Sequence, residues 1–189
     1  MFYKVMKIIA TILARILYRF NVTGMHHIPN EGAFLLCPNH IHGLDAVMLA
    51  VFSKRQLRFM AKKELFSPAV FGAFFRALGV FPVNRGGADM QAFRHSMNVL
   101  KSGQGLLIFA QGTRMKEFEN AKGGVALFAL KSGAPIVPVG ISGSYRIFSK
   151  LNIHVGQPIP MEKYQGEKVK SELIEEVMES VTNRITQLC

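Results

Sequence analysis

A histidine and an aspartate five positions apart are the residues of this chain best suited to acid–base chemistry. His40 and Asp45 lie in the polar segment PNHIHGLD, residues 38–45, which directly follows an apolar run. If the Asp45 carboxylate accepts a hydrogen bond from one ring nitrogen of His40, it fixes the tautomer and favours the imidazolium. The other ring nitrogen can then take a proton from a substrate hydroxyl, which could attack a thioester directly. The same spacing also fits an aspartate that caps a helix and a histidine in a polar turn.

The sequence does not indicate a covalent acyl-enzyme. The chain has no serine within a Gly-x-Ser-x-Gly elbow. Cys37 lies three residues before His40, but the apolar run around it predicts the inward-facing end of a buried strand. Direct transfer from donor to acceptor is therefore the chemistry that these residues favour.

Two arginines are placed where they could bind an anionic substrate. Arg85 and Arg114 each come shortly after an apolar run that predicts a strand, as His40 does. The carboxyl ends of parallel strands meet at one edge of a sheet, where ligands usually bind, and guanidinium groups suit phosphate. Either arginine alone would by default be a solvated surface residue. Lys63, next to Lys62, is a weaker candidate for the same role.

The elements that must position these residues alternate between short apolar runs and amphipathic stretches. This alternation predicts one α/β domain with a largely parallel central sheet flanked by helices. The expected strands are Ala33–Cys37, Leu57–Ala61, Val80–Val83, Gly105–Phe109, Ile136–Val139 and Ile153–Val155. The expected helices are Leu44–Phe52, Ser67–Leu78 with Ser67 as cap, Asp89–Lys101 with Asp89 as cap, Gly123–Lys131, and a closing amphipathic helix.

Residues 1–20 predict an amphipathic helix at a membrane interface, and residues 21–189 predict the folded domain. Basic side chains recur along one side of this helix, and isoleucine and leucine cover the rest. Its uncharged stretches are far shorter than the roughly 20 apolar residues that a bilayer crossing requires. We therefore expect peripheral or monotopic attachment. The alternative is an ordinary helix packed on the core.

The amino-acid composition limits the kinds of molecule that the protein is expected to bind. The formal net charge of +11 favours an anionic bilayer, a phosphorylated substrate or nucleic acid, and charge alone does not choose among them. The chain shows no recognised nucleic-acid motif, so we expect no nucleic-acid partner. Cys37 lies in an apolar run and Cys189 is the last residue, which argues against a disulfide and fits a reducing compartment. We expect the protein at the cytoplasmic face of the cell membrane.

Five short motifs in order resemble those of the glycerolipid acyltransferase family, which is typified by bacterial lysophosphatidate acyltransferase. The first is Asn39-His40 followed by Asp45, and the basic block AKKEL at residues 61–65 comes next. The second family motif resembles GVFPVNR, residues 79–85, which contains Phe81 and Arg85. The third resembles Gln111-Gly112-Thr113-Arg114, and the fourth, centred on Pro138, resembles residues 134–139. The order and spacing agree over roughly residues 20–160.

The resemblance implies an acyltransferase that needs no metal and no cofactor. The donor would be acyl-CoA or acyl-carrier protein, and the acceptor 1-acyl-glycerol 3-phosphate, which would give phosphatidic acid. His40 and Asp45 would be catalytic, and Arg85, Arg114 and Lys63 would bind the substrate phosphate. Asn39, Phe81, Gln111, Gly112, Thr113 and Pro138 would support these groups. Glycerol 3-phosphate or another lysophospholipid remains an alternative acceptor.

Two positions depart from the family pattern. His42 stands where the family often has a small polar residue, and Gln111 stands where it usually has glutamate. If that glutamate mainly accepts hydrogen bonds, the amide oxygen of Gln111 can replace it. We then expect Gln111→Glu to change the transfer rate by less than about tenfold. If its charge is needed, the chain would be an impaired membrane-binding homologue.

Overall fold

A seven-stranded sheet runs through the centre of the molecule, with strand order β1-β7-β6-β2-β5-β3-β4. The computed structural model describes residues 1–84, 89–110 and 123–189. The strands are β1 (Arg19–Thr23), β2 (Phe34–Pro38), β3 (Leu57–Lys62), β4 (Val80–Val83), β5 (Gly105–Leu107), β6 (Ile136–Gly143) and β7 (Lys150–Val155). All pairs of neighbours are parallel except β6 and β7. The predicted α/β domain with a largely parallel sheet is confirmed.

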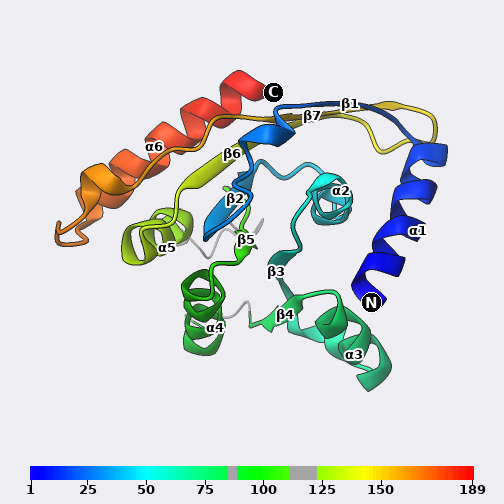
Figure 1. Ribbon diagram of the computed structural model, residues 1–189, viewed down its shortest axis with the longest axis horizontal. Coiled ribbons are helices and arrows are strands. Elements are labelled where there is room, and N and C mark those ends of the chain that lie inside the picture. Colours follow the sequence, from blue (N-terminus) through cyan, green and yellow to red (C-terminus); the bar gives the residue numbers. More distant parts are fainter. Residues whose placement is uncertain (85–88, 111–122) are drawn as a thin grey trace.

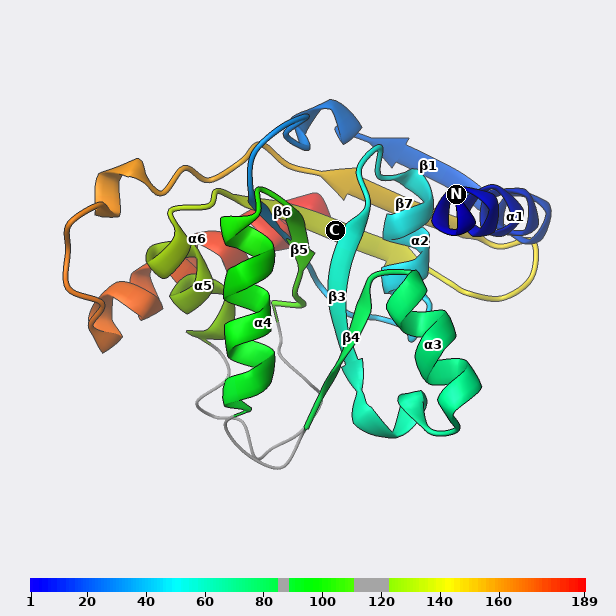
Figure 2. The ribbon, with the colours of Figure 1, turned by 60° about the horizontal axis from the view of Figure 1, so that its bottom comes forward.

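Helices cover both faces of the sheet (Figure 1). The helices are α1 (Phe2–Leu17), α2 (Asp45–Phe52), α3 (Ala69–Ala77), α4 (Met90–Lys101), α5 (Gly124–Ser132) and α6 (Ser171–Leu188). Helices α4, α5 and α6 lie on one side, whereas α1, α2 and α3 lie on the other, as a second view also shows (Figure 2). A separate apolar core fills each side of the sheet. This layered arrangement brings the carboxyl ends of β2, β3, β4 and β5 to one edge.

The central strand β2 is buried along its whole length, because helices cover both of its faces. Its sequence FLLCP is accordingly a continuous apolar run rather than an alternating one. The neighbouring strand β5 must begin with glycine, since a Cβ at Gly105 would lie 2.3 Å from the Phe34 ring. The loop that carries His40 therefore starts from a rigid part of the core.

The structure corrects the predicted beginning of the chain. Arg19 and Phe20, expected in the first helix, belong to β1, an edge strand that pairs with β7 in the register Arg19 to Lys150. Helix α1 ends at Leu17. The cap predicted at Ser67 is also wrong, because α3 begins at Ala69 with Pro68 as its N-cap. Asp89 is confirmed as the cap of α4, since its carboxylate accepts from the backbone N–H groups of Gln91 and Ala92.

Helix α1 packs on the protein through a side that includes Lys7, Thr11 and Ala14, and its isoleucines face away. Ala14 is buried against α2, and the Lys7 ammonium donates a hydrogen bond to the Ser53 carbonyl, where burial lowers the pKa of Lys7. Ile8, Ile12 and Ile16 point outward and are 59%, 55% and 61% exposed. The helix packs on the core, as the alternative interpretation required, but with its apolar face unburied. Of the helices in the described ranges, none is both long and apolar enough to cross a bilayer.

Candidate active site

His40 and Asp45 form a hydrogen-bonded pair at the carboxyl end of β2. His40 Nδ1 lies 2.7 Å from Asp45 Oδ2. A carboxylate can only accept, so Nδ1 carries the hydrogen in this contact and Nε2 is left as the nitrogen that can take a proton. The His40 side chain is 23% exposed, whereas Asp45 is completely buried. The pair thus joins a buried acid to an imidazole that a substrate can reach.

Backbone groups hold the buried Asp45 carboxylate in place. Oδ2 accepts from the N–H groups of Ile41 and His42, each at 2.8 Å. The other carboxylate oxygen, Oδ1, accepts from the Tyr145 hydroxyl at 2.6 Å. These donors stabilise a negative charge that is out of contact with water. Asp45 is the first residue of α2, but its carboxylate does not cap the helix, because Leu44 is the N-cap and has no side-chain cap hydrogen bond. The capping interpretation of Asp45 is therefore wrong.

Asn39 fixes the loop between β2 and Asp45 to the neighbouring strand. Its side-chain amide donates to the Ile141 carbonyl at 2.8 Å, and its amide oxygen accepts from the Ile141 N–H at 2.7 Å. This pair of bonds continues the pairing of β2 with β6 beyond the end of β2. The following residue, His40, therefore leaves the sheet at a fixed position.

Aromatic side chains enclose the pair. The His40 ring lies over the Phe109 ring with centroids 4.1 Å apart. The His42 ring stacks on Tyr145 at 4.3 Å, with 22° between the planes. Phe109 lies two residues after the end of β5. The chain there remains beside β2, since the Ala110 N–H donates to the Pro38 carbonyl. Two neighbouring strands and the loop after β6 thus contribute to one site.

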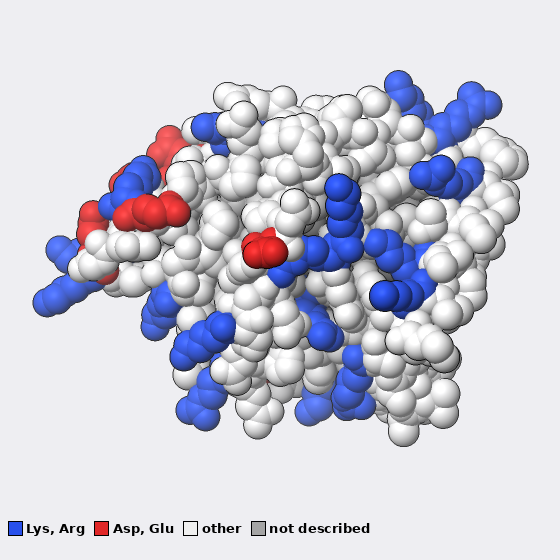
Figure 3. All heavy atoms as spheres, in the orientation of Figure 1, with Lys and Arg blue, Asp and Glu red and all other residues white. Residues whose placement is uncertain are grey.

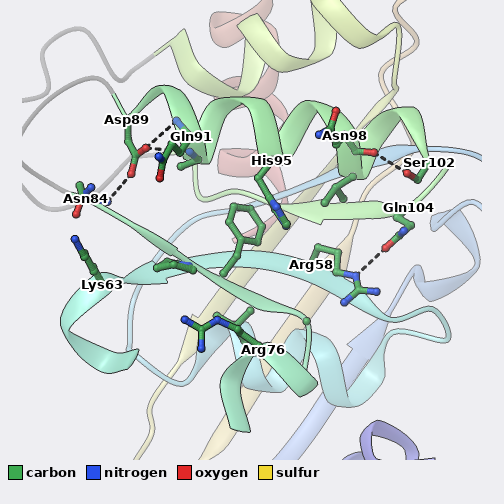
Figure 4. Close-up of a pocket in the computed structure, with 16 residues that line it drawn as sticks. Arg58, Lys63, Arg76, Asn84, Asp89, Gln91, His95, Asn98, Ser102 and Gln104 are labelled. Atoms are coloured by element: carbon green, nitrogen blue, oxygen red, sulfur yellow. Dashed lines mark hydrogen bonds between the residues drawn. The ribbon is translucent and has the colours of Figure 1, made fainter. Parts of the chain in front are cut away.

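Lys63 lies at the same edge of the sheet, in a groove along β4. It opens the short 3-10 helix η2 (Lys63–Phe66) directly after β3. Figure 4 shows it near Asn84 and Asp89, at the end of the groove where β4 ends. The Asn84 N–H, followed by the Ala92 N–H, lowers the pKa of Asp89, and the Lys63 charge adds to this effect. Arg58 and Arg76 also line the groove, so the groove as a whole favours anions.

The remaining predicted site residues fall into two groups. Arg85, Gln111, Gly112, Thr113 and Arg114 lie outside the described residues. Phe81 and Pro138 are in the sheet, in β4 and β6. The Phe81 ring packs against His95 of α4 with centroids 4.3 Å apart, and Pro138 pairs with Cys37 between β2 and β6.

The structure supports the exclusion of Cys37 as a nucleophile. The residue is completely buried, and this burial raises the pKa of its thiol far above the usual range. A buried neutral thiol is a poor nucleophile. Its side chain instead belongs to the core between the sheet and α4, α5 and α6.

Sequence reasoning missed Tyr145 and Phe109. Tyr145 is 100 positions from Asp45 along the chain, so no local pattern connects them. Phe109 ends an apolar run that was expected to be entirely strand, and the strand in fact stops at Leu107. The only available signal was that both follow strands of a parallel sheet near its active edge.

Comparisons with known proteins identify the family of the chain. The model of the family described as Acyltransferase matches residues 19–142. The chain is 31% identical to the 1-acyl-sn-glycerol-3-phosphate acyltransferase of Streptococcus pneumoniae, in an alignment that covers 98% of this chain and 70% of that protein. It is 28% identical to the protein of the same name from Bacillus subtilis, over 88% of this chain and 86% of that protein.

A solved structure shares the fold. The crystal structure of the 1-acyl-sn-glycerophosphate acyltransferase PlsC from Thermotoga maritima superposes with a TM-score of 0.72. The alignment covers 98% of this chain and 79% of that one, at 23% identity. At this level of identity the likeness establishes the architecture.

Proposed function

Because this chain belongs to the acyltransferase family and is an acyltransferase, we propose that it acylates 1-acyl-glycerol 3-phosphate to form phosphatidic acid. The observation that carries the proposal is the 2.7 Å contact between His40 and the buried Asp45. The two similar bacterial proteins are named for this acceptor. Acyl-CoA and acyl-carrier protein both present the required thioester, so either can be the donor.

In the proposed reaction His40 acts as a general base. Nε2 takes the proton of the acceptor hydroxyl while its oxygen attacks the thioester carbonyl. Asp45 stabilises the imidazolium that forms and keeps the ring in the required tautomer. The intermediate collapses with loss of the thiolate, which receives the proton from Nε2. A C–O bond replaces a C–S bond, and no covalent enzyme intermediate or cofactor is needed.

Phosphate recognition is assigned to the basic residues at the active edge. Of these residues, Lys63 lies in the described part of the chain. Arg85 and Arg114 are proposed on the basis of the motif resemblance. We expect Arg85→Ala or Arg114→Ala to impair the use of phosphorylated acceptors in particular. Their planar guanidinium groups can bind two phosphate oxygens at once through two parallel N–H···O bonds.

The proposal is tested by identifying the lipid product. Purified protein is incubated with a panel of acceptors: 1-acyl-glycerol 3-phosphate, glycerol 3-phosphate and lysophospholipids with head groups. Each is supplied with acyl-CoA and, separately, with acyl-carrier protein, and products are identified by mass spectrometry. Phosphatidic acid should be the main product. Preferential acylation of another acceptor would reassign the substrate, and no acyl transfer to any acceptor would reject the proposed function.

We further propose that α1 holds the protein on an anionic membrane surface. Its outward isoleucines are exposed, and the helix packs on α2 through its other side. Bilayer contact would bury this apolar face. The cysteines that fit a reducing compartment favour the cytoplasmic face of the membrane.

Two further segments extend this apolar surface. Val70 and Phe71 of α3 are exposed, and Phe2 of α1 contacts Phe74 of α3. At the other end of α1, Ile147 and Phe148 are also exposed. Phe148 has a φ of 65°, an unfavourable conformation for a bulky residue. These segments lie on the α1 side of the sheet (Figure 2).

The distribution of charge also favours contact between the α1 side of the protein and an anionic membrane. On the face shown in Figure 3, most acidic side chains gather at the end that carries α6, and basic side chains are spread over the rest. Arg19 and Lys150 pair in register next to the end of α1, and Arg15 and Arg146 are close to them in sequence. Each basic side chain near an anionic surface adds about 1 kcal/mol of attraction.

A further inference from the structure

Tyr145 contacts the candidate catalytic pair from outside the predicted motifs. It belongs to the loop of residues 144–149, between β6 and β7. Its hydroxyl donates to Asp45 Oδ1 at 2.6 Å, whereas His40 contacts Oδ2. Because Asp45 is completely buried, this hydroxyl takes the place of a water molecule that would otherwise solvate the carboxylate.

The Tyr145 ring is held by groups other than Asp45. The Tyr18 ring meets it edge-on with centroids 5.7 Å apart, and the His42 ring stacks on it. The loop is tied to the end of α1, since the Phe148 N–H donates to the Leu17 carbonyl at 2.6 Å. The loop also closes on itself through a hydrogen bond from the Ser149 hydroxyl to the Arg146 carbonyl. The hydroxyl is thus aimed at Asp45 by its surroundings.

We propose that Tyr145 is a positioning residue for acyl transfer: its hydroxyl orients Asp45 and sets how tightly the His40–Asp45 pair holds a proton. The proposal rests on the catalytic role assigned to that pair under the proposed function. Tyr145 itself touches neither reacting atom. It acts through the carboxylate, so its effect should be on turnover and pH dependence rather than on acceptor binding.

The direction of the pH effect follows from the hydrogen bond. A donor to Oδ1 disperses the negative charge of Asp45. Without it, the carboxylate attracts a proton more strongly, and the pair remains protonated to a higher pH. His40 would then be available as a base only at higher pH. Burial, followed by the bond to Asp45, raises the pKa of Tyr145 far above its usual value, so the hydroxyl remains a donor throughout the working range.

The first test is Tyr145→Phe, which keeps the ring between Tyr18 and His42 and removes only the hydroxyl. We expect kcat to fall by about tenfold, the equivalent of one hydrogen bond to a charged group, with little change in the acceptor KM. The acid limb of the pH–rate profile should move to higher pH. Circular dichroism and thermal unfolding establish that the variant is folded.

The second test replaces Tyr145 with 3-fluorotyrosine, which has nearly the same shape and a more acidic hydroxyl. The stronger donor should move the acid limb in the opposite direction, to lower pH. A packing role would produce no such reversal. The ring ¹⁵N titration of His40, followed by NMR, should shift in the same two directions, and this measurement does not depend on turnover.

Neighbouring titratable groups must be separated from the effect. His42 and Tyr18 are the ionisable side chains whose rings contact Tyr145 among the described residues, so each profile is repeated in a His42→Gln background. Equal shifts in both backgrounds assign the effect to the His40–Asp45 pair. The proposal is overturned if the pH–rate profile and the His40 ring titration are the same whether position 145 carries tyrosine, phenylalanine or 3-fluorotyrosine. If His40→Ala is inactive while the Tyr145 variants match the wild type, only the role of Tyr145 is lost.

Discussion

At His40, one ring nitrogen is committed to Asp45 and the other is the candidate base. We predict that His40→Ala lowers kcat by about 10²- to 10⁴-fold, the range that general base catalysis supplies. Acceptor binding, measured with immobilised lysolipid, should change little, because the imidazole is only one of the groups that border the site. Turnover close to that of the wild type would remove His40 from the mechanism.

Sequence reasoning reached the pair itself but not its surroundings. The spacing of His40 and Asp45 suggested the contact because only four residues separate them along the chain, which limits their separation in space. The Tyr145 hydroxyl reaches Asp45 only because β6 lies beside β2, so that contact depends on strand order. Apolar patterns predict strands well, but they do not predict which loop ends meet.

Among the elements, α4 offers a simple test of local stability. The Asp89 carboxylate accepts from the N–H groups of Gln91 and Ala92, each at 3.0 Å, and also from the Asn84 N–H at 2.9 Å. Asp89→Ala should lower the free energy of unfolding by about 1 kcal/mol at pH 7, because these donors lose their acceptor. Asp89→Asn, which retains a capping oxygen, is the matched control and should lose less.

The same cap should depend on pH. The backbone donors lower the pKa of Asp89 in the folded protein, so its contribution is present above the unfolded pKa, near 4. The contribution is lost as pH falls through the lowered folded pKa. The stability difference between the wild type and Asp89→Ala, measured by urea unfolding, should therefore shrink in acid. A difference that stays constant down to pH 2 would contradict this account.

Element boundaries show where sequence patterns fail. Val80–Val83 was predicted to the residue because turn residues bound this short apolar run on both sides. β1 was missed because Arg19 and Phe20 continue the helical spacing of the residues before them, and an edge strand has little apolar sequence of its own. The β6 prediction ended at Val139, but pairing with β7 extends the strand to Gly143. Strand pairing is a tertiary property, so it can override local pattern.

For the molecule as a whole, membrane contact is the property to test through α1. Removing residues 1–20 is a poor test, because it deletes buried Ala14 and Tyr18 and the start of β1. We predict instead that Ile8→Gln, Ile12→Gln and Ile16→Gln together weaken binding to anionic vesicles by at least about tenfold. These side chains are outside the core, so thermal stability should be preserved.

The control for this triple variant is Met90→Gln. Met90 is 57% exposed on α4, on the opposite side of the sheet, so its replacement should leave vesicle binding unchanged. Equal loss in both variants would indicate nonspecific apolar adsorption. Undiminished sedimentation of the triple variant with vesicles would reject α1 as the contact.

The loop after Tyr145 allows an independent measurement, because the chain contains no tryptophan. Phe148→Trp introduces a single tryptophan at an exposed position next to the end of α1. Its emission should shift to the blue on addition of anionic vesicles and be quenched by brominated acyl chains. Val169→Trp, near the start of α6, should show neither effect. If Phe148→Trp emission is unchanged while the protein sediments with vesicles, the loop is not part of the contact.

The outward-facing isoleucines of α1 also affect how the enzyme would find its acceptor. A protein held on a bilayer by this helix searches for lysolipid by lateral diffusion in two dimensions. Its rate then depends on the mole fraction of acceptor in the surface and not on the amount per millilitre. Diluting the lysolipid with an inert lipid, at constant bulk acceptor concentration, should therefore slow turnover.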